Sequence, residues 1–124
     1  MKILVADDDP MMRRIIELRL KKDGHQVTIV ADGREAIEHI NKSGNFDLII
    51  TDIMMPFSSG LEIVCKVKSN VAKKTPVIVL SAMGQENIVL EAFNLGADDY
   101  ITKPFSPNEL SMRVKRLAVT VSIT

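Results

Sequence analysis

The chain has 124 residues, a size at which a single domain buries roughly two thirds of the surface that its unfolded chain exposes. Apolar residues make up 46% of it and 16 basic side chains balance 16 acidic ones, so no global field steers it toward nucleic acid or an anionic membrane. Its one cysteine, Cys65, excludes an internal disulfide and suits a reducing cytosol, although an exported protein without disulfides has the same composition.

The first apolar run, Lys2–Ala6, predicts a buried strand. It is far too short for a signal peptide or a membrane span. Pro10–Lys22 then repeats apolar residues at helical spacing, with Asp9 as the expected N-cap and Gly24 as the stop. The next expected elements are a half-polar edge strand over His25–Val30, a helix over Gly33–Lys42 and a continuous apolar strand over Asp47–Thr51.

The second half of the chain repeats this alternation after a loop marked by proline and glycine. Its expected elements are a helix from Leu61 to Lys68, a strand over Pro76–Leu80, a helix over Gln85–Leu95 that stops at Gly96, and a strand over Asp98–Thr102. Ser106 as N-cap, Pro107 in the first turn and Glu109 of a capping box open the last helix. The apolar segment after Leu117 is either the end of this helix or the start of a linker.

Strands that alternate with helices in this way indicate an α/β domain with a parallel sheet and right-handed crossovers. The sequence contains no internal repeat or low-complexity tract that would divide it. We therefore expect one domain over residues 1–120 and a tail or linker start over residues 121–124.

Polar residues gather at the ends of the predicted strands. Three aspartates starting at Asp7 follow the first strand, Asp52 follows the third, Ser81 the fourth and Lys103 the fifth. Because the carboxyl ends of parallel strands share one edge of the sheet, we expect these side chains to lie together, at the edge where open α/β sheets bind ligands.

Carboxylates from Asp7, Asp8 and Asp52 repel one another unless a cation shares them. Oxygen ligands without histidine or cysteine favour a hard cation, and Mg²⁺ fits best because it also accepts phosphate oxygens and water. An aspartate beside such an ion can act as a nucleophile toward phosphorus. Lys103 would supply further positive charge and Ser81 a hydroxyl donor, so the set predicts phosphoryl transfer.

Four segments carry a resemblance to a known family: ILVADDDP, DLIITDIMMP followed by Gly60, VIVLSA, and GADDYITKPFSPNEL. In this order and spacing the chain resembles the receiver domain of a two-component response regulator, from residue 1 to about residue 118. The resemblance implies a flavodoxin-like, doubly wound (βα)5 sandwich whose five-stranded parallel sheet has the order 2-1-3-4-5.

The resemblance also implies a role for each site residue. Asp52 would be the phosphoacceptor, and Ser81 and Lys103 would bind the phosphoryl oxygens. The implied Mg²⁺ ligands are Asp8, Asp52 and the backbone carbonyl of Met54, with Asp7 bound through water. Tyr100 would act with Ser81 as the switch, and the Lys103–Pro104 peptide bond is expected to be cis.

As a receiver, the chain would take its phosphoryl group from a histidine kinase or a phosphotransfer protein. It would catalyse its own phosphorylation and dephosphorylation without being an enzyme in the usual sense. Phosphorylation would change the face made by the fourth helix, fifth strand and last helix, and so regulate an effector domain, such as a DNA-binding one, or a partner protein. We expect a cytoplasmic location, no membrane contact and no direct binding of nucleic acid by this domain.

The same face carries an incomplete set of the charges through which one transcription-factor class dimerises. Asp99 and Arg113 match one of its ion pairs, and Glu109 and Lys115 remain, whereas Val89 and Asn94 replace charged partners on the fourth helix. A homodimer through this face is therefore an expectation that only part of the sequence supports.

Three alternatives stay open at this point. The first is a stand-alone phosphorelay receiver that works by protein contact. An Asp-nucleophile phosphatase would want a second acid two residues after Asp52, where Met54 stands. A flavodoxin-like electron carrier would want a phosphate loop free of acids after the first strand.

Two methionines, two histidines and the cysteine lead to further predictions. The apolar Met54 and Met83 would offer no hydrogen bond to a water that attacks the phosphorylated aspartate, which predicts slow loss of phosphate. We expect His25 and His39 to be solvated and Cys65 to pack in the core.

Overall fold

The computed structural model describes residues 1–42, 45–55, 59–70 and 72–123, with side chains described as far as residue 118. The strands are β1 (Lys2–Ala6), β2 (Gln26–Val30), β3 (Leu48–Asp52), β4 (Val77–Ser81) and β5 (Asp99–Thr102). The helices are α1 (Pro10–Lys22), α2 (Gly33–Lys42), α3 (Gly60–Lys68), α4 (Glu86–Asn94) and α5 (Pro107–Ile123).

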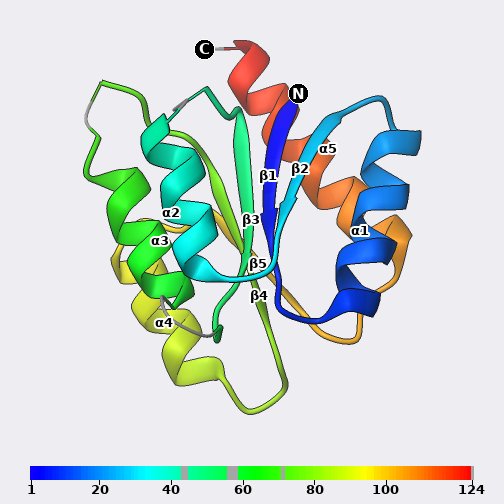
Figure 1. The fold of residues 1–124 in the computed structure, drawn as a ribbon. Coiled ribbons are helices and arrows are strands. Elements are labelled where there is room, and N and C mark those ends of the chain that lie inside the picture. The colour runs from blue at the N-terminus through cyan, green and yellow to red at the C-terminus, as the bar shows by residue number, and fades with distance from the viewer. Residues whose placement is uncertain (43–44, 56–58, 71, 124) are drawn as a thin grey trace.

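The strands form one parallel sheet in the order β2-β1-β3-β4-β5. Figure 1 shows this sheet between two helical layers, with α1 and α5 on one face and α2, α3 and α4 on the other. The order reverses between β1 and β3, which lie side by side although α1, β2 and α2 separate them in the chain. The doubly wound fold and its predicted strand order are confirmed.

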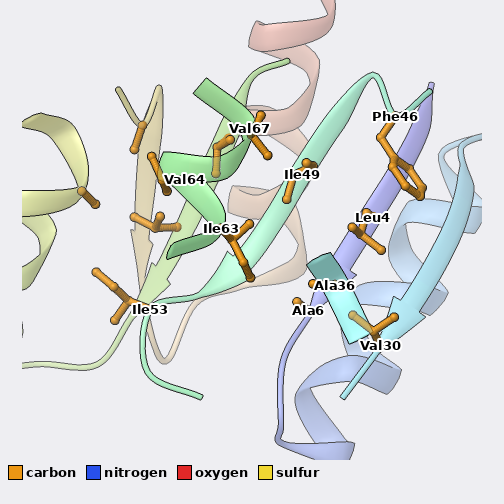
Figure 2. Close-up of a cluster of buried hydrophobic side chains, with 14 of the residues drawn as sticks. Leu4, Ala6, Val30, Ala36, Phe46, Ile49, Ile53, Ile63, Val64 and Val67 are labelled. Carbon is orange, nitrogen blue, oxygen red and sulfur yellow. The ribbon is translucent and has the colours of Figure 1, made fainter. Parts of the chain in front are cut away.

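Each face of the sheet has its own hydrophobic core. One core lies between the sheet and α2, α3 and α4, where Ile49, Ile63 and Val64 are buried (Figure 2). The other lies against α1 and α5 and includes Ile50 and Leu110. Because β3 and β4 are covered on both faces, all of their residues are buried, as continuous apolar runs predict.

The predicted capping residues occur where the sequence placed them. Asp9 precedes α1 and accepts hydrogen bonds from the backbone N–H groups of Met11 and Met12. Gly24 adopts a φ of 93° just after the helix, a conformation that glycine tolerates best. Ser106 Oγ accepts a hydrogen bond from the Glu109 N–H at the start of α5.

Four strands differ from the prediction by one residue at one or both ends. β2 begins at Gln26, β3 runs from Leu48 to Asp52, β4 runs from Val77 to Ser81, and β5 begins at Asp99. The ladder continues because the carboxyl ends of β3 and β4 pair with each other, Asp52 opposite Leu80. Asp52 and Ser81 are therefore the last residues of their strands and are held by the sheet.

Cys65 was expected in the core and is instead exposed, so that prediction is wrong. The buried stripe of α3 consists of Ile63, Val64 and Val67, which turns Cys65 toward solvent. His25 is half buried rather than solvated, with Nδ1 3.0 Å from the N-terminal ammonium group, and burial lowers its pKa. His39 is exposed, as expected.

The segment after Leu117 continues α5 as far as Ile123. The proposed domain limit at residue 120 stays a prediction, since the helix passes through it without a break. Within the described residues, no helix is both long and apolar enough to span a membrane.

Candidate functional site

The candidate site lies at the carboxyl ends of the strands, at the lower edge of the sheet in Figure 1. Asp7 and Asp8 directly follow β1, Asp52 ends β3, Ser81 ends β4 and Lys103 directly follows β5. The cis peptide bond expected between Lys103 and the next residue, a proline, is present. The structure therefore brings together the residues that the sequence analysis selected.

Three carboxylates form the centre of this site. One oxygen from each of Asp7, Asp8 and Asp52 lies within 4.8 Å of the others. Asp7 is fully buried and Asp52 is 8% exposed, whereas Asp8 is exposed to solvent. The cluster is thus closed on the protein side and open on the side where Asp8 stands.

Lys103 joins two of these carboxylates. Its Nζ lies 2.9 Å from Asp7 Oδ2 and 2.9 Å from Asp52 Oδ2. Burial alone would lower the pKa of Lys103, but the two carboxylates outweigh burial and raise it. The ammonium group therefore stays charged and sits within reach of any group bonded to Asp52.

Burial makes the ionised form of the Asp7 carboxyl group unfavourable. Burial raises the pKa of Asp7, and the charge of Lys103 and the N–H of Asp9, which donates to Oδ1 at 2.9 Å, offset this only in part. Its buried Oδ2 has the ammonium group at ion-pair distance but no hydrogen bond of good angle. This oxygen keeps the capacity for a further partner.

The donor set fits a hard divalent cation. Three carboxylates and one ammonium group leave a formal charge of −2 at the cluster, which one divalent ion would neutralise. All the side-chain donors are oxygens, and an open side allows water and phosphate oxygens to complete the coordination. A hard divalent cation such as Mg²⁺ favours such a set of ligands.

The start of α3 lies against the backbone at the end of β3. Gly60 N–H donates to the Ile53 carbonyl at 2.9 Å, and Ile53 N–H donates to the Leu80 carbonyl at 2.9 Å. A Cβ on Gly60 would lie 2.5 Å from the Asp52 carbonyl oxygen and 2.7 Å from Ile53 Cα. Only glycine fits there, so Gly60 helps to set the backbone that carries Asp52.

Ser81 borders a cavity of about 210 Å³ behind the site. The cavity is mostly apolar and extends along α4 to β5; its lining residues are Ser81, Ala82, Glu86, Val89, Leu90, Phe93 and Tyr100. Tyr100 is 42% exposed and packs edge to face against Phe93, with ring centroids 5.8 Å apart. A buried hydroxyl and a partly exposed aromatic ring thus share one cavity.

Two polar contacts at the site were missed from the sequence. Arg13 Nη1 donates to the Asp7 carbonyl at 2.8 Å, and Gln85 Oε1 accepts from the Ala82 N–H at 2.7 Å. Arg13 lies four residues after the N-cap Asp9, a spacing that could have placed it beside the acidic turn. Nothing in the sequence distinguishes Gln85 from an exposed helix-start residue.

The two methionines that closely follow Asp52 and Ser81 in the chain are both exposed. Met54 is 52% exposed and Met83 is 80% exposed. The Met54 backbone N–H donates to Asp52 Oδ1 at 3.3 Å, so this carboxylate is held through both of its oxygens. Neither methionine side chain can donate a hydrogen bond toward the site.

Comparison with protein families gives a match to the family described as "Response regulator receiver domain" over residues 3–115. Transcriptional regulatory protein ResD of Bacillus subtilis (strain 168) is 40% identical over 123 residues, which cover 99% of this chain and 50% of that protein. Transcriptional regulatory protein SrrA of Staphylococcus aureus (strain NCTC 8325 / PS 47) is 38% identical over 116 residues, which cover 94% of this chain and 47% of that protein. The chain therefore spans about half the length of these curated relatives.

Solved structures give the same result for the fold. The receiver domain of the Francisella response regulator 1452 superposes with a TM-score of 0.86 at 38% identity, covering 97% of this chain and 98% of that one. The chemotaxis response regulator CheY4 of Vibrio cholerae superposes with a TM-score of 0.84 at 34% identity, covering 94% of this chain and 97% of that one.

Proposed function

Since this chain belongs to the response regulator receiver family, we propose that Asp52 is the residue that accepts the phosphoryl group. A receiver is the signalling domain of a two-component response regulator, and the relatives above are transcriptional regulators by name, which leaves the phosphatase alternative without support. The observation that carries the proposal is Lys103 Nζ, which lies 2.9 Å from both Asp7 and Asp52 beside the third acid, Asp8.

The chemistry follows from these positions. A carboxylate oxygen of Asp52 forms a bond to phosphorus while the bond from phosphorus to the donor's histidine nitrogen breaks, and the imidazole leaves with a proton. Lys103 is within reach of the phosphoryl oxygens because it already contacts Asp52. Ser81, one residue past the β4 residue that pairs with Asp52, would donate its hydroxyl to another of these oxygens.

Asp8, Asp52 and the Met54 carbonyl would hold Mg²⁺ directly, and Asp7 would hold it through water. The ion, when bound, supplies the positive charge that three carboxylates and a phosphoryl group require. Asp7 is suited to an indirect role because it is buried and already paired with Lys103, while Asp8 faces solvent.

The partners we propose are a histidine kinase or phosphotransfer protein as donor and an effector domain as output. A DNA-binding effector is favoured over a stand-alone relay because the chain matches about half of each of two transcriptional regulators. The longer reading frame around this segment distinguishes these two cases. The single cysteine suits a cytoplasmic location for such a pair.

Ser81 and Tyr100 would transmit the effect of phosphorylation from Asp52 to the surface that regulates the effector domain. The phosphoryl group would draw the Ser81 hydroxyl toward it, and Tyr100 would turn into the cavity that both residues line. The face formed by α4, β5 and α5 would change as a result. The same face would form a homodimer, for which its exposed apolar side chains and the Asp99–Arg113 pair are the support.

The test is incubation with phosphoramidate or acetyl phosphate and Mg²⁺, followed by intact mass measurement. We expect the wild type to gain one phosphoryl group and Asp52→Asn to gain none. Omission of Mg²⁺ should prevent the gain. An unmodified wild type, or equal labelling of the Asp52→Asn variant, would overturn the assignment.

A further inference from the structure

The turn between β4 and α4 is closed by a side chain. The Ala82 N–H donates to Gln85 Oε1 at 2.7 Å, and the Gln85 N–H donates back to the Ala82 carbonyl at 3.3 Å. Only the oxygen of the Gln85 amide can accept from an N–H, so the orientation of that amide is fixed chemically. We call the contact between Ala82 N–H and Gln85 Oε1 the Gln85 latch.

The latch holds a backbone donor beside the end of β4, the strand that pairs with the strand carrying Asp52. β4 ends at Ser81, so the Ala82 N–H is the first backbone donor beyond the end of that strand. It lies two residues past Leu80, the residue that pairs with Asp52 on the neighbouring strand. A phosphoryl group on Asp52 needs donors for three oxygens, and Lys103, Ser81 and a bound cation leave room for a backbone N–H.

We propose that Gln85 is a positioning residue that holds the Ala82 N–H in the unphosphorylated state and yields it to the phosphoryl group. This inference rests on the proposed phosphorylation of Asp52. Gln85 then sets how readily that reaction proceeds, since the hydrogen bond to Oε1 must break before the Ala82 donor can face phosphorus. The latch is a regulatory device acting on the site and not a part of the carboxylate cluster.

The same exchange would pass the signal to α4. Gln85 directly precedes the helix, and its own carbonyl accepts from the Val89 N–H at 3.0 Å in the first turn. Gly84 has a φ of 89° and no atom within 4 Å of a built Cβ, so the turn has space to change shape. Ala82, Glu86 and Val89 line the 210 Å³ cavity that Tyr100 also lines. When Gln85 releases the Ala82 N–H, the neighbouring residues that line this cavity are free to shift. Ser81 and Tyr100, the proposed switch residues, line the same cavity.

The side-chain type determines the strength of the latch. A neutral amide oxygen is a weaker acceptor than a phosphoryl dianion, so it can be displaced. A glutamate of the same length would hold the N–H more tightly and would repel the incoming phosphoryl group. An alanine would leave the donor free. Variants at this one position should therefore move phosphorylation in opposite directions.

The experiment measures initial phosphorylation rates by phosphoramidate with Mg²⁺ on the full chain, using intact mass. We expect Gln85→Ala to react about 2- to 10-fold faster than wild type, the effect of removing one net hydrogen bond. Gln85→Glu should react several-fold slower. Asn87→Ala, two residues away on the exposed side of α4, is the matched control and should keep the wild-type rate.

A second readout separates the latch from a merely structural role. The Ala82 amide proton should shift in the NMR spectrum of unphosphorylated Gln85→Ala, while Mg²⁺ affinity without phosphodonor stays as in wild type. A wild type that takes no phosphate would refute the proposed function itself. A wild type that is phosphorylated at the same rate as both Gln85 variants would refute the latch alone.

Discussion

At the scale of single residues, Asp7 carries its charge in a buried and unfavourable position within the site. It is fully buried, it shares Lys103 with Asp52, and its pKa is raised chiefly by burial. A carboxyl group whose pKa rises on folding stabilises the folded state below its unfolded pKa. This effect is lost, and becomes a cost, as pH rises through the raised folded-state pKa. Asp7 therefore costs stability at neutral pH, which agrees with the proposed cation site.

Asp7→Asn should raise the free energy of unfolding by about 1 kcal/mol at pH 7 in the presence of a chelator, because it removes a buried negative charge and keeps an oxygen for the Asp9 N–H. The gain should shrink toward pH 4, where the wild-type carboxyl becomes protonated. Urea denaturation at both pH values measures this. The same variant should bind Mg²⁺ more weakly, and a variant that is less stable than wild type at pH 7 would contradict the charge argument.

We expect Met54 and Met83 to slow the loss of phosphate, because exposed thioether side chains cannot donate a hydrogen bond that would orient an attacking water. The double variant Met54→Asn, Met83→Glu should lose phosphate faster than wild type. Time-resolved intact mass after removal of the phosphodonor gives both rates. Faster loss from the wild type than from this variant would show that the methionines do not protect the phosphate.

At the scale of elements, α3 is seated against the end of β3 by a glycine. Gly60→Ala should lower the free energy of unfolding by about 1–3 kcal/mol, because the new methyl group would overlap the backbone of Asp52 and Ile53. Phosphorylation should slow as well, since the backbone that holds Asp52 must shift. Chemical denaturation and intact mass test the two effects. Cys65→Ala, an exposed change in the same helix, should leave both quantities close to wild type.

A second contact between elements joins α1 to α5. Ser111 Oγ donates to Asp23 Oδ2 at 2.6 Å, and this hydrogen bond, together with Arg19, lowers the pKa of Asp23. A lowered pKa means that the contact stabilises the fold above the usual pKa of 3.8 and loses that effect as pH falls through the folded-state value.

Ser111→Ala should therefore destabilise the protein by about 1.5–3 kcal/mol at pH 7, the range for a hydrogen bond to a charged group. The difference between variant and wild type should become smaller below pH 3.8, the unshifted value for this group. Thermal unfolding at a series of pH values checks the trend. A difference that grows in acid would mean that Asp23 is not stabilised through its ionised form.

At the scale of the whole molecule, the two cores bury both faces of the sheet, and some of the apolar side chains left outside lie together on α4 and β5. Leu90 and Phe93 on α4 and Tyr100 on β5 remain partly exposed there. Asp99 is paired within the chain, with Arg113 at 2.8 Å and Arg116 at 2.7 Å. A dimer through this face would thus be stabilised by contacts between these apolar side chains. It would also require the ion pairs of Asp99 to rearrange.

We expect the phosphorylated chain to self-associate and the unphosphorylated chain to remain monomeric. Leu90→Arg should prevent association, since it adds charge to an exposed apolar position on this face. Sedimentation velocity with and without phosphodonor measures this. Equal association of wild type and Leu90→Arg would place the dimer contact elsewhere, and a monomeric phosphorylated wild type would rule it out for this segment.

The sequence by itself was enough to predict the elements and their caps, because hydrophobic period and capping are local properties of the chain. It also placed Asp7, Asp52, Ser81 and Lys103 at one edge, since parallel strands align their carboxyl ends. Strand order came from the family resemblance, as no local pattern encodes which strands are neighbours.

The tertiary structure alone decided the contacts that depend on how helices rotate and where loops turn. It buried Asp7 while leaving Asp8 exposed, it placed Lys103 between two carboxylates, and it turned Cys65 outward. It also closed the Ala82 turn with Gln85. The burial of Asp7, the position of Lys103 and the closure of the Ala82 turn follow from packing among residues far apart in the chain or from the path of a turn, and the sequence carries no period or motif for them. Cys65 differs, because the helical period of α3 was compatible with more than one buried stripe.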